Sequence, residues 1–371
     1  MSTFVPPIRA DLANEVPYGA PQLDVPVRLN VNENPFALPN ELAQAMGAAV
    51  AAIAPELNRY PDREAVELRA ELAKYLNSES GVVVTGEQVW AANGSNEVMH
   101  QLFLAFGGPG RTAISFDPTY SMYPEYARDT FTRYLTYARN DDFSVDVADA
   151  VQAIAAEKPS IVLLTSPNNP TGTAVATADI IAILEAGLAV NAVVVVDEAY
   201  AEFRRAGTPS ALELLAMYPN LMVSRTMSKA FGLAGARLGY AVASTQLIDA
   251  LRIVRLPYHL STVTQVVAVT ALQHADLLQA QVATLRDERD ALAQWLEQQG
   301  YRVAQSDANF ILFGTFEDRD VVWQSLLDQG VLIRQTGPKG WLRVSVGTPE
   351  ENDRFRAALQ QAPGTEQEAQ G

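Results

Sequence analysis

The sequence feature that most constrains the fold is a series of short apolar runs, rich in β-branched residues, each ending at a polar residue or directly before one. Four such runs follow one another: Ala113–Phe116, Ile161–Thr165, Val193–Val196 and Leu221–Ser224. Segments with helical spacing of apolar residues, such as Glu64–Leu76, also occur in this part of the chain. Buried strands that alternate with helices are typical of a mostly parallel sheet covered on both faces. We therefore predict an α/β fold.

The length of 371 residues is sufficient for two domains. The first thirty residues are rich in proline and lack periodicity, as in an arm that crosses a surface. A long helical stretch, Thr262–Gln299, is followed by short strands and by a last helix from Pro349. The predicted strands are Asn309–Phe313, Val331–Arg334 and Trp341–Val346. We expect an arm and part of a small domain over residues 1–35, a large domain over residues 36–256 and the rest of the small domain over residues 257–371.

Charge and composition exclude several classes of function. The chain has 27 basic and 43 acidic residues, a formal net charge of −16, and so acidic a surface repels nucleic acid. Its longest apolar stretch, Ala186–Val196, is too short to span a bilayer, and the N-terminus lacks the pattern of a signal peptide. With no cysteine and three histidines, neither disulfides nor a zinc site are expected. We predict a cytoplasmic protein without nucleic-acid, membrane or metal partners.

Two of the motifs contain polar groups that suit a bound anion or a ligand oxygen. Ligands of open parallel sheets bind beyond the carboxyl ends of the strands. Ser95 and Asn96 follow Asn93-Gly94 and open a helix, where free backbone N–H groups suit a phosphate, although a plain helix cap has the same pattern. Asn169 lies in a turn with two prolines after Ile161–Thr165, and its amide can donate a hydrogen bond to a ligand.

Two ionisable residues follow the next two runs. Asp197 comes directly after Val193–Val196, where a partly desolvated carboxylate either finds a cationic partner or caps a helix. Lys229 lies among small and apolar residues, with Arg237 eight residues later. Desolvation of this lysine would turn an ordinary solvated cation into an amine nucleophile.

In combination, the four motifs meet the needs of pyridoxal 5′-phosphate. This cofactor needs an amine for its aldehyde, an anion site for its phosphate and a carboxylate that keeps its ring nitrogen protonated. Lys229, the turn at Ser95 and Asn96, and Asp197 supply these three groups. We therefore predict this cofactor.

With these motifs the chain resembles the class I/II aminotransferases, and within them it looks like the histidinol-phosphate aminotransferases. The resemblance covers nearly the whole chain. The segments that carry it are Tyr18–Gln22, Leu29–Pro35, Asn58–Asp62, Leu256–Ser261 and Leu342–Gly347. It implies the aspartate aminotransferase fold (fold type I of the pyridoxal-phosphate enzymes), with a large domain, a smaller α/β domain and a homodimeric assembly.

The resemblance implies a role for each motif residue around the cofactor ring. Lys229 matches the lysine that forms the internal Schiff base, and Asp197 matches the partner of the pyridine nitrogen. Tyr200 and Asn169 match the groups that hydrogen-bond the phenolic oxygen. Tyr120 lies where the family stacks an aromatic ring on the pyridine.

The phosphate site follows from the same resemblance. The phosphate-binding positions of the family correspond here to Ser95, Asn96, Thr226, Ser228 and Arg237. Tyr60 matches a tyrosine that reaches the cofactor phosphate of the neighbouring subunit. Many relatives carry an acid in place of Asn96, so the role of this side chain stays open.

Substrate residues are implied as well. Arg343 matches the arginine that takes the α-carboxylate, and Tyr18, Asn32, Tyr258 and Arg334 fall at further substrate positions. Tyr18, Tyr258 and Arg334 favour a phosphorylated substrate, although Arg334 could instead be a charged strand end at the surface. The resemblance implies transamination between histidinol phosphate and 2-oxoglutarate, which gives imidazole-acetol phosphate and glutamate in histidine biosynthesis.

Three alternatives share part of the pattern. An aromatic amino-acid aminotransferase and a phosphothreonine-type decarboxylase have the same cofactor motifs, so these motifs cannot separate them. A regulator built on this fold would need a nucleic-acid module, and no basic helix-turn-helix segment precedes residue 30.

Overall fold

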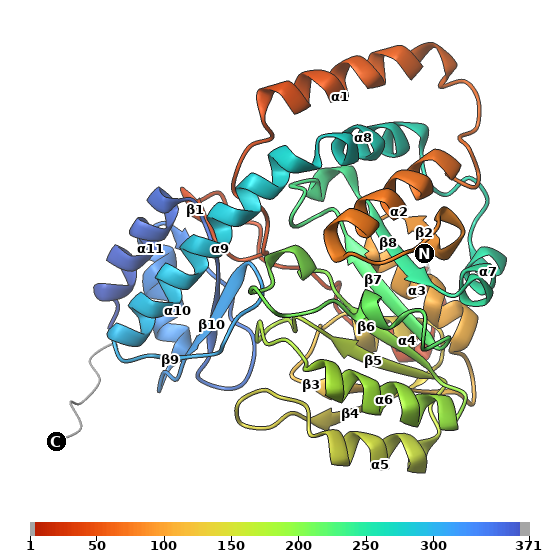
Figure 1. Cartoon of the computed structure of the whole chain (residues 1–371). Helices are drawn as coiled ribbons and strands as arrows, with labels where there is room; N and C mark the ends of the chain where they lie inside the picture. Colours follow the sequence, from red (N-terminus) through yellow and green to blue (C-terminus); the bar gives the residue numbers. More distant parts are fainter. Residues whose placement is uncertain (1–3, 364–371) are drawn as a thin grey trace.

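The main feature of the structure, a computed structural model that describes residues 4–363, is a seven-stranded sheet between two layers of helices (Figure 1). The strand order is β2-β8-β7-β6-β5-β3-β4. The bounds are β2 Val89–Ala92, β3 Thr112–Asp117, β4 Arg133–Ala138, β5 Ile161–Thr165, β6 Val193–Asp197, β7 Leu221–Thr226 and β8 Gly239–Ala243. Only β8 pairs antiparallel to its neighbours, β2 and β7. The predicted α/β fold with a mostly parallel sheet is confirmed.

The four strands predicted from apolar runs are the centre of this sheet. Strands β5, β6 and β7 are buried along their whole length, as a central parallel strand requires. Strand β4 lies at the edge and is only partly covered, so its residues form no apolar run. Strands β2 and β8 contain alanine and glycine, which have low strand propensity. For this reason sequence patterns did not reveal these three strands.

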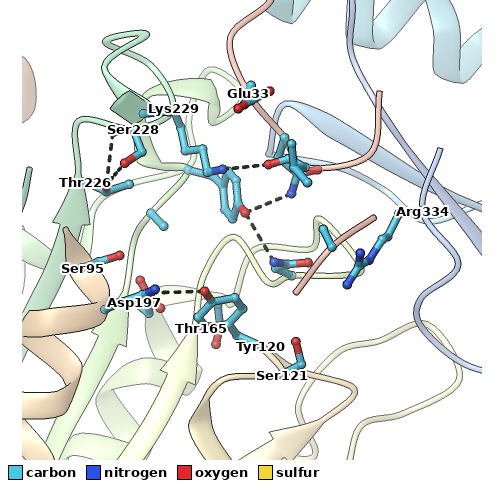
Figure 2. Close-up of a pocket in the computed structure, with 18 of the residues that line it drawn as sticks. Glu33, Ser95, Tyr120, Ser121, Thr165, Asp197, Thr226, Ser228, Lys229 and Arg334 are labelled. Carbon is cyan, nitrogen blue, oxygen red and sulfur yellow. Dashed lines mark hydrogen bonds between the residues drawn. The ribbon is translucent and has the colours of Figure 1, made fainter. Parts of the chain in front are cut away.

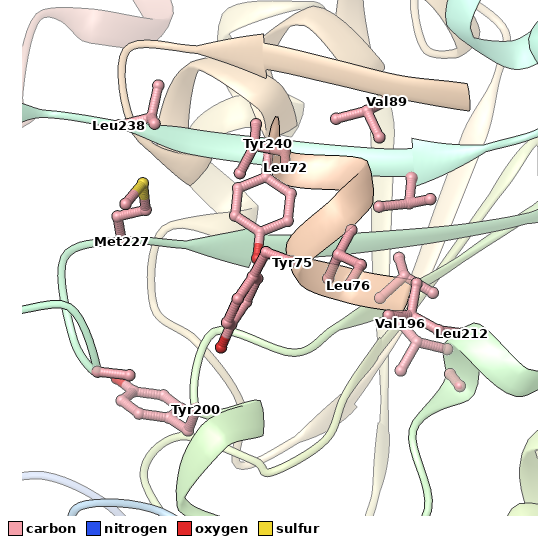
Figure 3. Close-up of a cluster of buried hydrophobic side chains, with 14 of the residues drawn as sticks. Leu72, Tyr75, Leu76, Val89, Val196, Tyr200, Leu212, Met227, Leu238 and Tyr240 are labelled. Carbon is pink, nitrogen blue, oxygen red and sulfur yellow. The ribbon is translucent and has the colours of Figure 1, made fainter. Parts of the chain in front are cut away.

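Helices cover the two faces of the sheet in separate sets. One face holds α3 (Ser95–Phe106), α4 (Tyr123–Asp129) and α7 (Thr245–Val254). The other holds α2 (Val66–Ser80), α5 (Val147–Glu157), α6 (Thr177–Ala189) and α8 (Thr262–Gln273). Along β6, Val193 and Val195 join the first core, whereas Val194 and Val196 join the second. Figure 3 shows part of the second core, with the rings of Tyr75 and Tyr240 among its apolar side chains.

The helical stretch predicted over Thr262–Gln299 forms two helices that meet at His274. Helix α8 ends at Gln273 and α9 runs over Ala275–Gln298. At His274 the backbone leaves the helical conformation (φ −117°, ψ 28°). Helix α8 packs against α1 (Asn40–Ile53) and α2, and α9 extends from this core to that of a smaller sheet (Figure 1).

The smaller sheet contains three strands in the order β12-β10-β9, and a separate parallel pair is formed by β1 and β11. The bounds are β1 Val27–Arg28, β9 Arg302–Val303, β10 Phe310–Gly314, β11 Val331–Leu332 and β12 Leu342–Ser345, with α10 at Arg319–Asp328 and α11 at Pro349–Gln360. The strand predicted to reach Arg334 ends at Leu332, and Arg334 makes an isolated bridge with Arg343. Within residues 4–363 no helix is both long and apolar enough to cross a membrane.

Candidate active site

A single pocket receives most of the residues that the sequence singled out. It lies where the carboxyl ends of β5, β6 and β7 face the loops before α1 and the strand β12 (Figure 2). All but two of the predicted site residues line it. These are Tyr18, Asn32, Ser95, Asn96, Tyr120, Asn169, Asp197, Tyr200, Thr226, Ser228, Lys229, Arg237, Arg334 and Arg343. The exceptions are Tyr60 and Tyr258.

Asp197 ends β6 in a buried position with one oxygen free. Tyr123, at the start of α4, donates from its hydroxyl to Oδ2 of Asp197 at 2.8 Å. Among residues 4–363, no hydrogen-bond partner reaches Oδ1 of Asp197, which is buried. Burial raises the pKa of Asp197 to about 6, against the hydrogen bond from Tyr123, which lowers it. A cationic N–H donor beside Oδ1 would therefore stabilise this carboxylate.

Lys229 follows β7 and enters the same pocket. Its Nζ donates to the carbonyl oxygen of Val31 at 2.9 Å. Burial, together with the nearby guanidinium groups of Arg343 and Arg237, lowers the pKa of Lys229 to about 8. The carboxylate of Glu33 acts in the opposite direction. A neutral amine is therefore accessible here close to neutral pH.

A cradle for a phosphate group forms where α3 begins. Gly94 precedes the helix with φ +80°, and a Cβ at Gly94 would stand 2.7 Å from a guanidinium nitrogen of Arg237. A Cβ at Gly239 of β8 would collide with the backbone nitrogen of Ser95. Only glycine at both positions lets Arg237 and the N-terminus of α3 converge.

The opposite wall of the cradle comes from the segment after β7. Thr226 donates from Oγ1 to Oγ of Ser228 at 3.0 Å, and the backbone N–H of Ser228 donates back to Oγ1 of Thr226 at 3.1 Å. Nη1 of Arg237 lies 3.5 Å from Oγ of Ser228. Two hydroxyls, one guanidinium and a helix N-terminus thus surround one space, as an anion requires.

Tyr200 is held by amide groups from two distant segments. Asn32 donates from Nδ2 to the hydroxyl oxygen of Tyr200 at 3.0 Å, and Asn169 does so at 3.4 Å. Asn32 is fixed in turn by Ser345, whose hydroxyl donates to Oδ1 of Asn32 at 3.0 Å. Burial raises the pKa of Tyr200, so that it stays protonated at neutral pH.

Two guanidinium groups mark the other end of the pocket. Arg343, on β12, is buried; it donates to Oδ1 of Asn169 and, at 2.9 Å, to the carbonyl oxygen of Asn30. Nε of Arg343 has no hydrogen-bond partner in the part of the chain that the structure describes. Burial lowers the pKa of Arg343 to about 10, with the charge of Arg334 acting in the same direction. Arg334 pairs with Arg343 through the backbone and reaches the same pocket (Figure 2). An anion at this end would relieve the repulsion between the two cations.

Tyr120 and Asn96 support each other. The hydroxyl of Tyr120 donates to Oδ1 of Asn96 at 3.3 Å. The ring of Tyr120 also packs edge-on against Tyr123, with 5.6 Å between the ring centroids. The side chain of Asn96, whose role the sequence left open, therefore orients the ring that lines the pocket.

The predicted substrate residue Tyr258 lies apart from Tyr18 and Arg334 within this chain. Tyr18 lines the pocket, and its hydroxyl lies 2.9 Å from that of Ser121. Tyr258 instead stacks on Tyr60, with ring centroids 4.5 Å apart. Both rings are exposed, Tyr60 by 80% and Tyr258 by 42%. Neither ring lines the pocket of its own chain because the segments that carry them lie outside it.

Sequence reasoning missed several residues that shape the site. Tyr123 orients Asp197, Ser345 orients Asn32, and the carbonyl oxygen of Val31 receives the amine of Lys229. Each acts on a residue that lies far away in the sequence, so no local spacing of residues predicts the contact. In the described residues, no group of three or more His, Cys, Asp or Glu side chains is arranged to hold a metal ion.

Comparison with known proteins gives a consistent result. The sequence model of the family described as "Aminotransferase class I and II" matches residues 25–359. A histidinol-phosphate aminotransferase of Thermobifida fusca is 60% identical over 358 residues, which are 96% of each chain. A histidinol-phosphate aminotransferase of Bifidobacterium adolescentis is 56% identical over 368 residues, with 95% of this chain and 94% of that one covered.

Solved structures agree in fold. A histidinol-phosphate aminotransferase of Sinorhizobium meliloti, in complex with pyridoxal-5′-phosphate, superimposes with a TM-score of 0.80 at 24% identity over 90% of both chains. The aspartate aminotransferase of Thermus thermophilus with maleate superimposes with a TM-score of 0.77 at 25% identity, again over 90% of both chains.

Proposed function

Since this chain belongs to the class I and II aminotransferases, we propose that it transfers an amino group between histidinol phosphate and 2-oxoglutarate, as a step of histidine biosynthesis. The observation that carries the proposal is that Arg343 and Arg334 share one pocket with Lys229 and Asp197. An amine, a buried carboxylate and a double cation in one pocket suit an anionic amino substrate.

The pocket fits pyridoxal 5′-phosphate, the cofactor that the family implies. No donor from the described residues reaches Oδ1 of Asp197, and a protonated ring nitrogen would provide one. The cradle suits a phosphate because the absence of a Cβ at Gly94 and at Gly239 lets Arg237 and the backbone of Ser95 come close together. When bound, the cofactor supplies an aldehyde for the substrate amine and an electron sink for the bond broken at Cα. Tyr120 would cover one face of its ring, and Tyr200 with Asn169 would hold its phenolic oxygen.

Lys229 is the group that moves the proton at the substrate Cα. Its buried amine, with a pKa lowered to about 8, can accept and return a proton near neutral pH. Arg343 holds the anionic group on one substituent of this carbon, which is the carboxylate in glutamate and the phosphate on the CH₂–O group in histidinol phosphate. Arg334 and Tyr18 provide further donors on the side where the larger phosphate needs them.

We also propose a homodimer, located in the cytoplasm. The stacked rings of Tyr60 and Tyr258 lie near other exposed apolar side chains, Leu57, Ile253 and Leu256, in neighbouring segments. Exposed apolar side chains of this kind are typical of a surface that a partner covers. In such a dimer, Tyr60 and Tyr258 would complete the pocket of the partner subunit.

The half-reaction tests this proposal without a second substrate. Purified protein loaded with cofactor is mixed with histidinol phosphate, and the visible absorption spectrum is recorded together with the products. We expect one equivalent of imidazole-acetol phosphate per subunit and a shift of the cofactor band to shorter wavelength. An unchanged spectrum with histidinol phosphate, together with a shift on addition of phenylalanine, would favour the aromatic amino-acid aminotransferase.

A further inference from the structure

A cluster of five charged side chains, three of them buried and two partly buried, lies beside the pocket and takes no part in the chemistry proposed above. It consists of Arg225 on β7, Glu198, Glu202 and Arg204 after β6, and Glu79 near the end of α2. We call it the buried ion cluster. It lies in the core on the α2 side of the sheet, beside Tyr75 and Tyr240. Figure 3 labels these two rings, although not the charged side chains themselves.

Arg225 is the centre of this cluster. Its side chain is fully buried, and Nε and Nη2 both donate to Oε2 of Glu198, at 3.0 and 2.8 Å. Nη1 donates to Oε2 of Glu79 at 2.9 Å. A single guanidinium thereby ties together β7, the segment after β6 and helix α2, with the fork geometry that lysine lacks.

The pair Glu198–Arg225 lies on the opposite side of the strand ends from the proposed cofactor site. Glu198 follows Asp197 directly, and Arg225 directly precedes Thr226. Neighbouring residues of a strand point to opposite faces, so the pair Glu198–Arg225 lies behind the pair Asp197–Thr226. The backbone N–H of Glu198 also donates to the carbonyl oxygen of Ser224 at 2.8 Å. The ion pair therefore clamps the two strand ends that carry the cofactor-facing residues.

Stability alone does not account for a cluster of this kind. Three carboxylates face two guanidinium groups, and burial raises the pKa of Glu202 to about 7, so that a proton can offset the excess negative charge. Buried ion pairs lose hydration, and apolar residues of similar size are commonly at least as stabilising. What a rigid guanidinium that donates through two nitrogens to one carboxylate oxygen does provide is a fixed distance between the elements that it joins.

We propose that Arg225 and Glu198 are positioning residues, whose ion pair fixes the ends of β6 and β7 so that Asp197, Thr226 and Lys229 meet the cofactor in the correct geometry. This inference rests on the proposed function, since it assumes that the pocket holds pyridoxal 5′-phosphate. Displacement of a reacting group by about 1 Å can cost up to a hundredfold in rate, so a small shift of either strand end has a large effect.

The test uses a double variant, Arg225→Met with Glu198→Gln. It removes one charge of each sign, so the net charge of the cluster stays constant. The Gln side chain retains an acceptor for the backbone N–H of Ala211, which donates to Oε1 of Glu198 at 2.7 Å. Arg225→Lys keeps the charge but loses the fork. The control is Arg133→Met, which breaks the exposed pair of Arg133 with Glu157 on the edge strand β4.

Four quantities are measured for each variant as purified protein: the unfolding temperature, the cofactor dissociation constant, the pH dependence of the bound cofactor's absorption spectrum, and kcat with KM. We expect the double variant to unfold within about 2 °C of wild type, which for a chain of this length corresponds to about 1 kcal/mol. Its cofactor should bind about tenfold or more weaker, its spectral midpoint should move, and kcat should fall about tenfold or more. For Arg225→Lys, these values should lie between those of wild type and those of the double variant. Arg133→Met should match wild type in all of them.

The proposal is overturned if the double variant and Arg225→Lys both bind cofactor, titrate and turn over within about threefold of wild type. If the double variant does not fold, the same threefold criterion is applied to Arg225→Lys alone. Failure of the proposed function has a different signature: wild-type protein would bind the cofactor but leave histidinol phosphate unchanged. Cofactor affinity and the spectral titration do not depend on the amino substrate and would still test the clamp.

Discussion

Lys229 and Asp197 occupy the same buried pocket, and burial shifts the pKa of each side chain in the direction that favours its neutral form. The pKa of the lysine falls to about 8 and that of the aspartate rises to about 6, because each charged form loses hydration there. Strongly shifted groups of opposite type in one pocket are a signature of catalytic sites. The two predictions that follow separate their roles.

Replacement of Lys229 by Ala should abolish turnover. Of the described residues that line the pocket, Lys229 is the only lysine, so no other amine can take over its chemistry. Steady-state assays with histidinol phosphate and 2-oxoglutarate measure the effect. Multiple turnover by the purified variant, above that of a mock purification, would refute the assignment.

Replacement of Asp197 by Asn should leave part of the cofactor bound but lower the rate by orders of magnitude, because an amide does not keep the ring nitrogen protonated. The same change should stabilise the cofactor-free protein. In that state the folded pKa of about 6 lies above the ordinary value of 3.8, so the carboxylate destabilises the fold increasingly as the pH rises through this window.

Chemical denaturation of cofactor-free protein at several pH values measures this second effect. Above pH 6 the Asn variant should be more stable than wild type by up to about 3 kcal/mol, and the difference should shrink as the pH falls toward 4. A rate within about threefold of wild type would instead reduce Asp197 to a structural cap.

Arg343 should serve both substrates, whereas Arg334 should serve mainly histidinol phosphate. Arg343→Gln should impair both histidinol phosphate and glutamate, because both place an anion at the same end of the pocket. Arg334→Gln should impair histidinol phosphate more, by about 1.5–3 kcal/mol, or about ten- to a hundredfold in kcat/KM. Both substrates are assayed with each variant. Equal losses in the Arg334 variant would contradict the division, and no loss at all would return Arg334 to a surface role.

At the scale of elements, the sequence predicted structure and site residues best where the pattern lies within a single strand and the residues directly after it. The ends of β5, β6 and β7 are buried, so their apolar runs and the polar residues after them, such as Asn169 and Asp197, are visible locally. Contacts between elements produce no such local pattern in the sequence. Tyr123 reaches Asp197 because α4 packs against the sheet, and Arg225 reaches Glu79 because α2 lies on the other face.

The segments that carry Tyr60 and Tyr258 show the same limit. Motif resemblance suggested a place for both rings, but only the fold reveals that they stack on each other outside their own pocket. Tyr60 was expected to act across a subunit boundary, and Tyr258 now shares that expectation. Their pairing predicts that the two rings act as one unit in the partner's site.

Subunit mixing tests this role of the Tyr60 segment. Tyr60→Phe should weaken cofactor retention by about 1–2 kcal/mol, the scale of one hydrogen bond to a charged group. Lys229→Ala protein mixed with Tyr60→Ala protein should recover activity in hybrid dimers, since one of the two sites then has both side chains intact. Absence of recovery after confirmed subunit exchange would place Tyr60 in the site of its own subunit.

At the scale of the whole molecule, the two sheets and the helix between them set the position of the pocket. Helix α9 joins the core of the large sheet to that of the small sheet, and Arg343 reaches the pocket from the small-sheet side. The domain boundary at residue 257 stays a prediction. Packing of α8 on α1 and α2 favours a boundary further along, within α9.

The cofactor motifs belong to the whole family, so substrate choice is the central claim that they cannot decide. We propose that it depends on the pair Arg343 and Arg334 at one end of the pocket and, in the proposed dimer, on side chains of the partner subunit. An aromatic amino-acid aminotransferase needs one anion site beside the substrate Cα and an apolar surface for the ring. A phosphate ester needs more donors than one carboxylate does.

The most direct measurement is the ratio of kcat/KM for histidinol phosphate to that for phenylalanine, with 2-oxoglutarate as the common acceptor. We predict a ratio of about a hundred or more, because phenylalanine has one anionic group and leaves the half-buried guanidinium of Arg334 without an ionic partner. The ratio should fall about tenfold or more in Arg334→Gln. A wild-type ratio near or below one would contradict the assignment and identify the aromatic amino acids as the substrates.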